Sequence, residues 1–234
     1  MTTEPQIAIV TDSSAYIPES ALKGLNISII PVWLIWDEQR YRDGVDIDPA
    51  TFYQRLKSSK TLPTSSQPSP GEFVELYKTL AHDADIILNI LVSSKISGTI
   101  ASAESAQKYL PDLDIRIVDS LSSSMGLGLV VLAGARAVAE GQSVDQAIKA
   151  AEDMCDNLHF LFMVDTLEFL HRGGRITGGK RLLGSALKIK PILQFKDGLI
   201  QPCSQARTRG KAIAQLMKIA DQRLDGKKMV EAAV

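Results

Sequence analysis

The sequence predicts an α/β protein with a parallel-sheet N-terminal domain, helices on both faces of that sheet, and a second α/β (α+β) domain. Up to about residue 157, short apolar runs alternate with segments of helical periodicity, as in strand–helix–strand crossovers. Residues 86–92 form a nearly continuous apolar run, typical of a strand buried on both faces. The pattern then changes to a glycine-rich basic loop and a hairpin. We therefore expect domains over residues 5–157 and 158–234.

The elements of the first domain follow from apolar runs and helix-start signals. Strands are expected at residues 6–10, 27–34 with an interruption at Pro31, 86–92 and 115–118. A turn is expected over residues 37–40. Asp48 before Pro49 marks one helix start, and Ser69 with Glu72 has the spacing of a capping box. The expected helices begin near residues 19, 49, 70, 100, 125 and 144.

The second domain begins with a strand at residues 158–164 and a short helix at 166–172. A glycine-rich basic loop follows at 172–180, and Asp197-Gly198 is the turn signal of a hairpin between residues 191–195 and 199–202. An amphipathic helix is expected at 211–224, and residues 228–234 have the pattern of a beginning strand. A chain seldom stops there, so we expect this domain to be incomplete and less stable than a longer version, with an unpaired sheet edge.

Charge and composition exclude several classes of protein. The 26 basic and 27 acidic residues leave a formal charge of −1, which argues against a general nucleic-acid surface. Two cysteines cannot complete a four-ligand zinc site. The sequence has no apolar run of roughly 18 residues and no signal-peptide pattern at its start. We therefore expect a cytoplasmic protein without stable membrane insertion.

Four hydroxyl-rich segments are the candidate functional groups. Three of them follow predicted strands, where ligands of open α/β sheets bind, and the fourth precedes a helix. Hydroxyls with free backbone N–H groups at a helix start make an anion site, and Ser97-Gly98-Thr99 fits this best. Helix capping alone is the competing interpretation of each segment. The candidate residues are Ser13, Thr64, Ser65, Ser97, Gly98 and Ser120.

Other kinds of site have weak support. Residues 174–180 match the spacing of a phosphate-binding loop, but Arg181 stands where a Mg²⁺-binding hydroxyl is needed. No G-x-S-x-G elbow occurs, and of the three histidines only His171, beside the glycine loop, is placed to approach a ligand. Asp43, Asp46 and Asp48 suggest a metal cluster, although Asp48 is better used as a cap. The sequence therefore favours ligand binding over chemistry, with no catalytic residue, metal or cofactor.

A set of short motifs in a fixed order resembles the bacterial DegV family of fatty-acid-binding proteins. The resemblance runs from about residue 6 to the chain end. It rests on IVTDSSAYIP (9–18), YRDGVDI (41–47), LPTSSQPSPGEF (62–73), SGT (97–99), VDS (118–120) and LHRGGRI (170–176).

This resemblance implies a carrier that holds one long-chain fatty acid between two domains. It also implies a separate, ATP-dependent fatty acid kinase as partner, which makes an acyl phosphate for phospholipid synthesis. Carried over by position, the carboxylate would meet Ser65, Ser97, Gly98 and Arg175. Ser65 stands where the family usually has threonine. Further ligand or partner-surface positions are Ser13, Thr64, Ser120, His171, Arg172 and Arg207.

The resemblance also implies a departure at the chain end. Members continue into a His-Gly segment whose histidine approaches the carboxylate, so we expect a truncated chain or an incomplete site.

Two other functions stay open from the residues: a small-molecule transferase or hydrolase using the same cleft, and a regulatory ligand sensor. The missing acid/base pair is the main obstacle to the enzyme, so we expect the carrier and not an enzyme.

Overall fold

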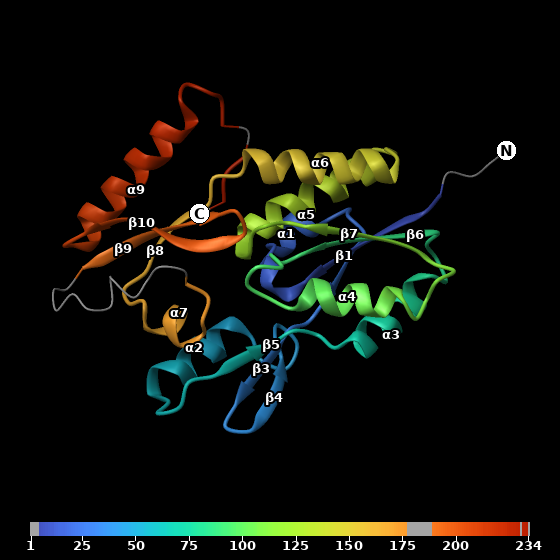
Figure 1. The fold of residues 1–234 in the computed structure, drawn as a ribbon, viewed down its shortest axis with the longest axis horizontal. Helices are drawn as coiled ribbons and strands as arrows, with labels where there is room; N and C mark the ends of the chain where they lie inside the picture. The colour runs from blue at the N-terminus through green and yellow to red at the C-terminus, as the bar shows by residue number, and fades with distance from the viewer. Residues whose placement is uncertain (1–4, 177–188, 230, 234) are drawn as a thin grey trace. The chain divides into compact units, whose positions relative to one another are not determined.

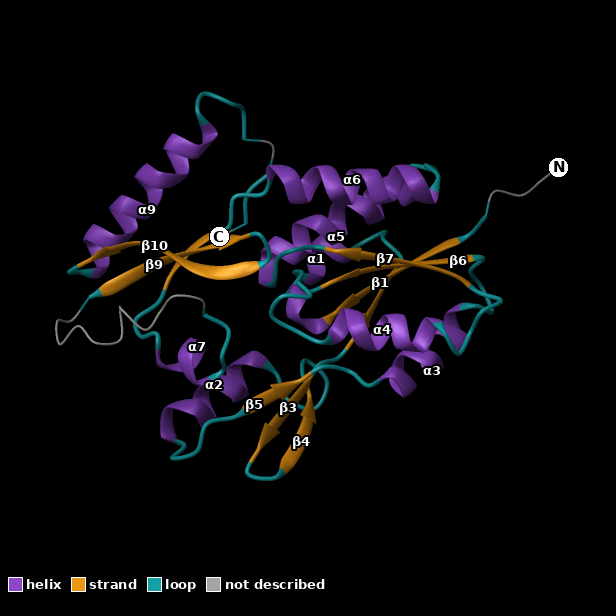
Figure 2. Cartoon of the chain, viewed as in Figure 1, coloured by secondary structure: helices purple, strands orange, loops and turns teal. Residues whose placement is uncertain are grey.

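The computed structural model describes residues 5–176, 189–229 and 231–233. The chain divides into two compact units, Met1–Asp156 and Asn157–Val234. Each unit is mixed α/β, as the sequence predicted (Figures 1 and 2). Among the described helices, none is both long and apolar enough to cross a membrane.

The first unit is built on a four-stranded parallel sheet. Its spatial order is β2 (Ile27–Ile30), β1 (Ile7–Asp12), β6 (Ile86–Leu91) and β7 (Asp114–Asp119). Strand β1 is buried along its whole length, because it lies inside the sheet and helices cover both faces. The predicted parallel sheet is thus confirmed: all four strands run in the same direction, because the connections between them carry the chain back to the end where the strands begin.

Two helix pairs cover the faces of this sheet (Figure 1). The pairs are α3 (Pro70–Leu80) with α4 (Thr99–Gln107), and α5 (Ser124–Ala139) with α6 (Val144–Asn157). Phe73 and Tyr77 of α3 and Ile100 of α4 pack with Val10 and Leu91 of the sheet in one buried cluster. The short segments η1 (Ser13–Ala15) and α1 (Glu19–Leu22) follow β1.

The predicted helix starts are confirmed by their caps. Ser69 accepts the backbone N–H of Glu72, and the Glu72 carboxylate accepts the N–H and hydroxyl of Ser69 in return. Asp48 accepts the Thr51 N–H at the start of α2 (Pro49–Ser58). A side chain that satisfies these otherwise unpaired N–H groups stabilises a helix by about 1 kcal/mol.

A second, antiparallel sheet in the first unit was not predicted. Its order is β4 (Gln39–Arg42), β3 (Trp33–Trp36) and β5 (Thr64–Ser66). The single strand expected at residues 27–34 is therefore wrong. Pro31 separates β2 from β3, and the two strands belong to different sheets. Proline cannot donate to a strand ladder, so the chain leaves the parallel sheet there.

The second unit contains an antiparallel sheet in the order β10 (Leu199–Ala206), β9 (Lys190–Lys196) and β8 (Leu161–Met163). The predicted Asp197-Gly198 turn joins β9 to β10, with positive φ at both residues. Leu193 and Ile200 of the sheet are buried with Leu167. The helices of this unit are α7 (Glu168–Arg172) and α9 (Arg209–Leu224).

Two expectations for the second unit were wrong in extent. The strand expected at residues 158–164 covers only Leu161–Met163. The strand expected at residues 228–234 does not form among its described members, which are exposed and belong to none of the described strands. An apolar pattern makes a strand only where another strand offers its free N–H and C=O groups.

Candidate functional site

The loop from β6 to α4 carries the hydroxyl group that best fits an anion. Ser97 lies in this loop, and its Oγ is 2.9 Å from Oγ1 of the buried Thr99. The N-cap residue of α4 is Gly98, which provides no side-chain hydrogen bond to the helix. The first N–H groups of a helix need partners from outside it and carry partial positive charge. The Thr99 N–H donates to Ser97 Oγ at 3.4 Å, so the start of α4 offers the Ser97 hydroxyl and the Gly98 N–H to an anion.

Ser65 lies in β5 of the small antiparallel sheet, within the segment that precedes α3. It does not belong to the parallel sheet whose strands the other three hydroxyl segments follow. Ser65 is paired with Leu34 of β3, and both Thr64 and Ser65 are exposed. Local sequence identified the hydroxyls, but the strand partner of residues 64–66 lies about thirty residues earlier in the chain.

Gln67 connects this strand to the α4 loop. An added Cβ at Gly98 would lie 2.9 Å from Gln67 Nε2 and 3.0 Å from its Cδ, so the Gln67 amide packs directly on Gly98. The contact brings the segment bearing Ser65 to the loop bearing Ser97. Gln67 is not among the residues predicted from the sequence, and its position two residues after Ser65 was the available signal.

The polar side chains at the end of β1 form hydrogen bonds within the fold. Asp12 is fully buried and accepts hydrogen bonds from the Ser14 N–H at 3.0 Å and the Val92 N–H at 2.9 Å. Burial raises the pKa of this carboxyl above its usual value. Ser13 donates its hydroxyl to Asp43 at 2.8 Å and accepts the Val32 N–H at 3.1 Å. Ser13 thus joins the parallel sheet to the chain around the small sheet.

Ser120, after β7, is also occupied by its own loop. It is buried, donates to the Ser122 carbonyl at 3.3 Å and accepts the Ser122 N–H at 3.2 Å. Its hydroxyl stabilises the turn into α5 and is not exposed to a ligand in this structure.

The three aspartates considered as a metal cluster have separate partners. Asp43 holds Ser13, and Asp48 caps α2. The hydrogen bond from Arg42 lowers the pKa of Asp46 to about 2. Within the described residues no three potential ligands gather into a metal-binding group.

The basic candidates lie in the second unit and are all exposed. Arg172 forms an ion pair with Glu168 at 3.0 Å, and the Arg175 guanidinium donates to the Gly173 carbonyl at 2.5 Å. His171 lies in the last turn of α7, and Arg207 precedes α9. Most of the phosphate-loop match at residues 174–180, and Arg181 after it, lie outside the described residues.

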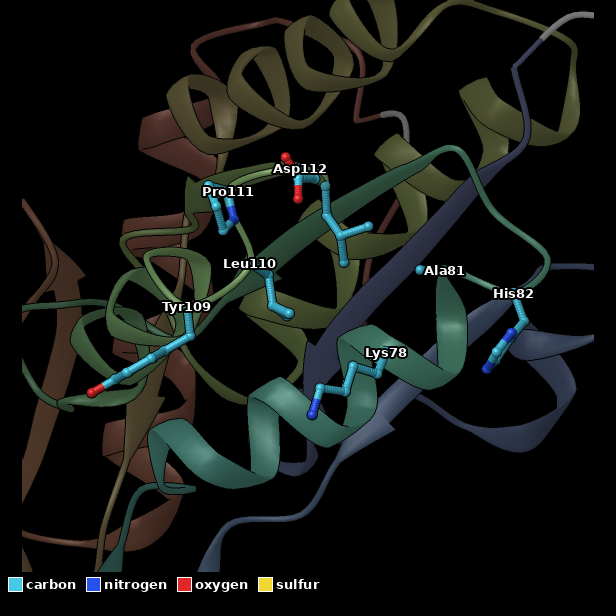
Figure 3. Close-up of a pocket in the computed structure, with 8 residues that line it drawn as sticks. Lys78, Ala81, His82, Tyr109, Leu110, Pro111 and Asp112 are labelled. Atoms are coloured by element: carbon cyan, nitrogen blue, oxygen red, sulfur yellow. The ribbon is translucent and has the colours of Figure 1, made fainter.

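A surface groove of about 460 Å³ lies away from these hydroxyls (Figure 3). It is lined by Lys78, His82, Tyr109, Leu110 and Asp112, among others, from the end of α3 and the loop after α4. These segments lead into the amino ends of β6 and β7, whereas Ser97 follows the carboxyl end of β6. The groove therefore belongs to the opposite edge of the sheet.

The sequence and the fold both match known proteins. A family model described as "uncharacterised protein, DegV family" matches residues 6–234. The chain belongs to the DegV family. Protein DegV of Bacillus subtilis is 39% identical over 217 residues, which cover 92% of this chain and 77% of that protein.

Two solved DegV structures have the same fold. A fatty-acid-binding DegV protein from Thermus thermophilus is 35% identical with a TM-score of 0.88, covering 95% of this chain and 79% of that one. DegV of B. subtilis, described as a fatty acid binding protein, is 38% identical with a TM-score of 0.85, covering 94% of this chain and 79% of that one. The resemblance stated from the motifs is confirmed at the level of the family.

Proposed function

We propose that this DegV protein binds one long-chain fatty acid and holds its carboxylate on Ser65, Ser97 and the backbone N–H of Gly98. The start of α4 supports this most directly. The Ser97 hydroxyl is held by Thr99, and within the described residues the Gly98 N–H has no acceptor. The fatty-acid-binding relatives from T. thermophilus and B. subtilis support the ligand class.

The carboxylate site needs no acid, base or metal for this role. A hydroxyl and a backbone N–H donate to an ionised carboxylate, and each such charged hydrogen bond contributes roughly 1.5–3 kcal/mol. The apolar tail of the fatty acid adds binding free energy by burial of its surface. We therefore assign this protein the role of a carrier and not of an enzyme.

We further propose that the bound acid is presented to a separate, ATP-dependent fatty acid kinase. The kinase transfers the γ-phosphoryl group of ATP to a carboxylate oxygen, which gives an acyl phosphate and ADP. Arg175 is the proposed cation for the carboxylate, and His171, Arg172 and Arg207 form the proposed kinase-facing surface. Their support is the LHRGGRI motif and their exposure.

Extraction of the purified protein with organic solvent, followed by mass spectrometry, tests the ligand. We expect a long-chain fatty acid, and the delipidated protein should bind palmitate in a calorimetric titration. An extract without fatty acid, together with no heat of palmitate binding, would overturn the proposed carrier function. Turnover of palmitate by a fatty acid kinase, with and without the carrier, tests presentation separately.

A further inference from the structure

We propose that Gln67 is a positioning residue of the carboxylate site. By packing on Gly98 it holds the strand that carries Ser65 at a fixed distance from the loop that carries Ser97. This inference rests on the proposed function, because Ser65 and Ser97 are the ligands that it aligns.

The backbone places Ser65 and Gln67 on the same side of their segment. Side chains alternate along an extended chain, so residues two apart share a face. Gln67 precedes the buried Pro68, and a residue before proline is restricted to extended conformations. Since Gln67 contacts Gly98, the Ser65 side of the segment is the side directed to the α4 loop.

Space, and not backbone conformation, explains the glycine at position 98. Its φ of −87° is open to any residue. The three atoms nearest to an added Cβ all belong to the Gln67 amide, at 2.9, 3.0 and 3.4 Å. An alanine at this position would therefore displace Gln67 without straining the backbone of α4.

The other side of the Ser65 segment is fixed independently. Ser66 pairs with Trp33 of β3, and the Trp33 indole N–H donates to Glu72 at 2.9 Å. Loss of Gln67 therefore leaves the small sheet and the start of α3 intact. It removes a contact between that sheet and the α4 loop, which changes the spacing of the two serines.

A double-mutant cycle of Gln67→Ala and Gly98→Ala tests the contact, with palmitate affinity measured by calorimetry. We expect each single substitution to weaken binding about tenfold, or about 1.4 kcal/mol. The double variant should be no weaker than either single one, because both remove the same contact. Additive losses, or no loss in either single variant, overturn the inference.

Two controls separate positioning from general damage. Gln67→Met keeps a chain of similar length over Gly98, and we expect its palmitate affinity to stay within about twofold of the parent. The variants should bind 1-hexadecanol, which has the same tail and no carboxylate, as the parent does. An equal loss for the alcohol overturns the inference. A parent chain that binds no palmitate overturns the proposed function and the inference together, whereas additive losses in a binding parent overturn the inference alone.

Discussion

Ser97, unlike Ser13 and Ser120, is paired with another side-chain hydroxyl. Ser97 Oγ lies 2.9 Å from Thr99 Oγ1 and accepts the Thr99 N–H at 3.4 Å, whereas Ser13 and Ser120 donate to a carboxylate and a carbonyl. A hydroxyl pair can reorient its protons so that Ser97 donates to an incoming carboxylate. The half-buried Ser97 hydroxyl can therefore turn its proton toward a ligand while it still accepts the Thr99 N–H.

Replacement of Ser97 by alanine tests this residue. We expect Ser97→Ala to weaken palmitate binding about tenfold, since one charged hydrogen bond is lost. Turnover by a fatty acid kinase should fall further, because a misplaced carboxylate loses reaction geometry. Ser105→Ala, in the helix that follows this loop, is the matched control: that hydroxyl donates to the Ala101 carbonyl. Unchanged turnover with weaker binding would make Ser97 an anchor only and contradict presentation.

Asp43 predicts a pH dependence of stability. Burial raises the pKa of its carboxyl from 3.8, so the folded chain binds this proton more tightly than the unfolded chain does. The resulting stabilisation is present below the unfolded pKa and is lost as pH rises through the folded pKa. Asp43→Asn retains an acceptor for Ser13 without the buried charge.

We therefore expect Asp43→Asn to be more stable than the parent at neutral pH, with the difference shrinking as pH falls through the raised folded pKa and vanishing below the unfolded pKa. Urea unfolding from neutral to acidic pH measures it. A difference that stays constant over this range would show that the substitution acts through packing and not through the charge.

Two hairpins in the chain use turns of the same length but different residues. Asp197-Gly198 joins β9 to β10, and Asp37-Glu38 joins β3 to β4. All four residues have positive φ, which glycine adopts freely and glutamate does not. The strain at Glu38, whose φ is 67°, is held by the pairing of β3 with β4 and β5.

Glu38→Gly should therefore stabilise the first unit. Relief of the left-handed conformation outweighs the added freedom of glycine in the unfolded chain, and we expect a gain of roughly 0.5–1 kcal/mol in the free energy of unfolding. Denaturant unfolding followed by tryptophan fluorescence suits this test, because Trp33 and Trp36 lie in β3. Glu75→Gly, inside α3, is the opposite control and should lose about 1 kcal/mol.

For the whole molecule, the proposed ligand divides its binding energy between tail and headgroup. Burial of a sixteen-carbon tail contributes at most about 12 kcal/mol before association costs, at about 0.8 kcal/mol per CH₂. The headgroup contributes a smaller, fixed amount. Affinity should therefore depend mainly on the tail, while the polar residues position the carboxylate.

A titration series of laurate, myristate and palmitate checks this division. We expect each added pair of methylenes to strengthen binding by up to about 1.6 kcal/mol. Ser97→Ala should give a parallel series shifted by a constant amount. Affinity independent of tail length would contradict tail-dominated binding, and a shift that grows with tail length would show that Ser97 also shapes the tail site.

Features set by neighbours in the chain were predictable from the sequence. The Ser69–Glu72 capping box depends on four consecutive residues, and the Asp197-Gly198 turn on two, so local chemistry determines them. The parallel strands followed from apolar runs that only a doubly covered sheet can bury. The motifs were also sufficient to indicate the DegV family.

Tertiary structure alone decided which strands pair and which side chains meet. Pro31 marks a break in the apolar run, but the sequence does not say that Trp33 pairs with Ser66 while Ile30 pairs with Asp12. The contact of Gln67 with Gly98 likewise joins residues about thirty positions apart. Such contacts depend on the packing of whole elements against one another, because strand pairing and side-chain contact are satisfied by proximity in space and not along the chain.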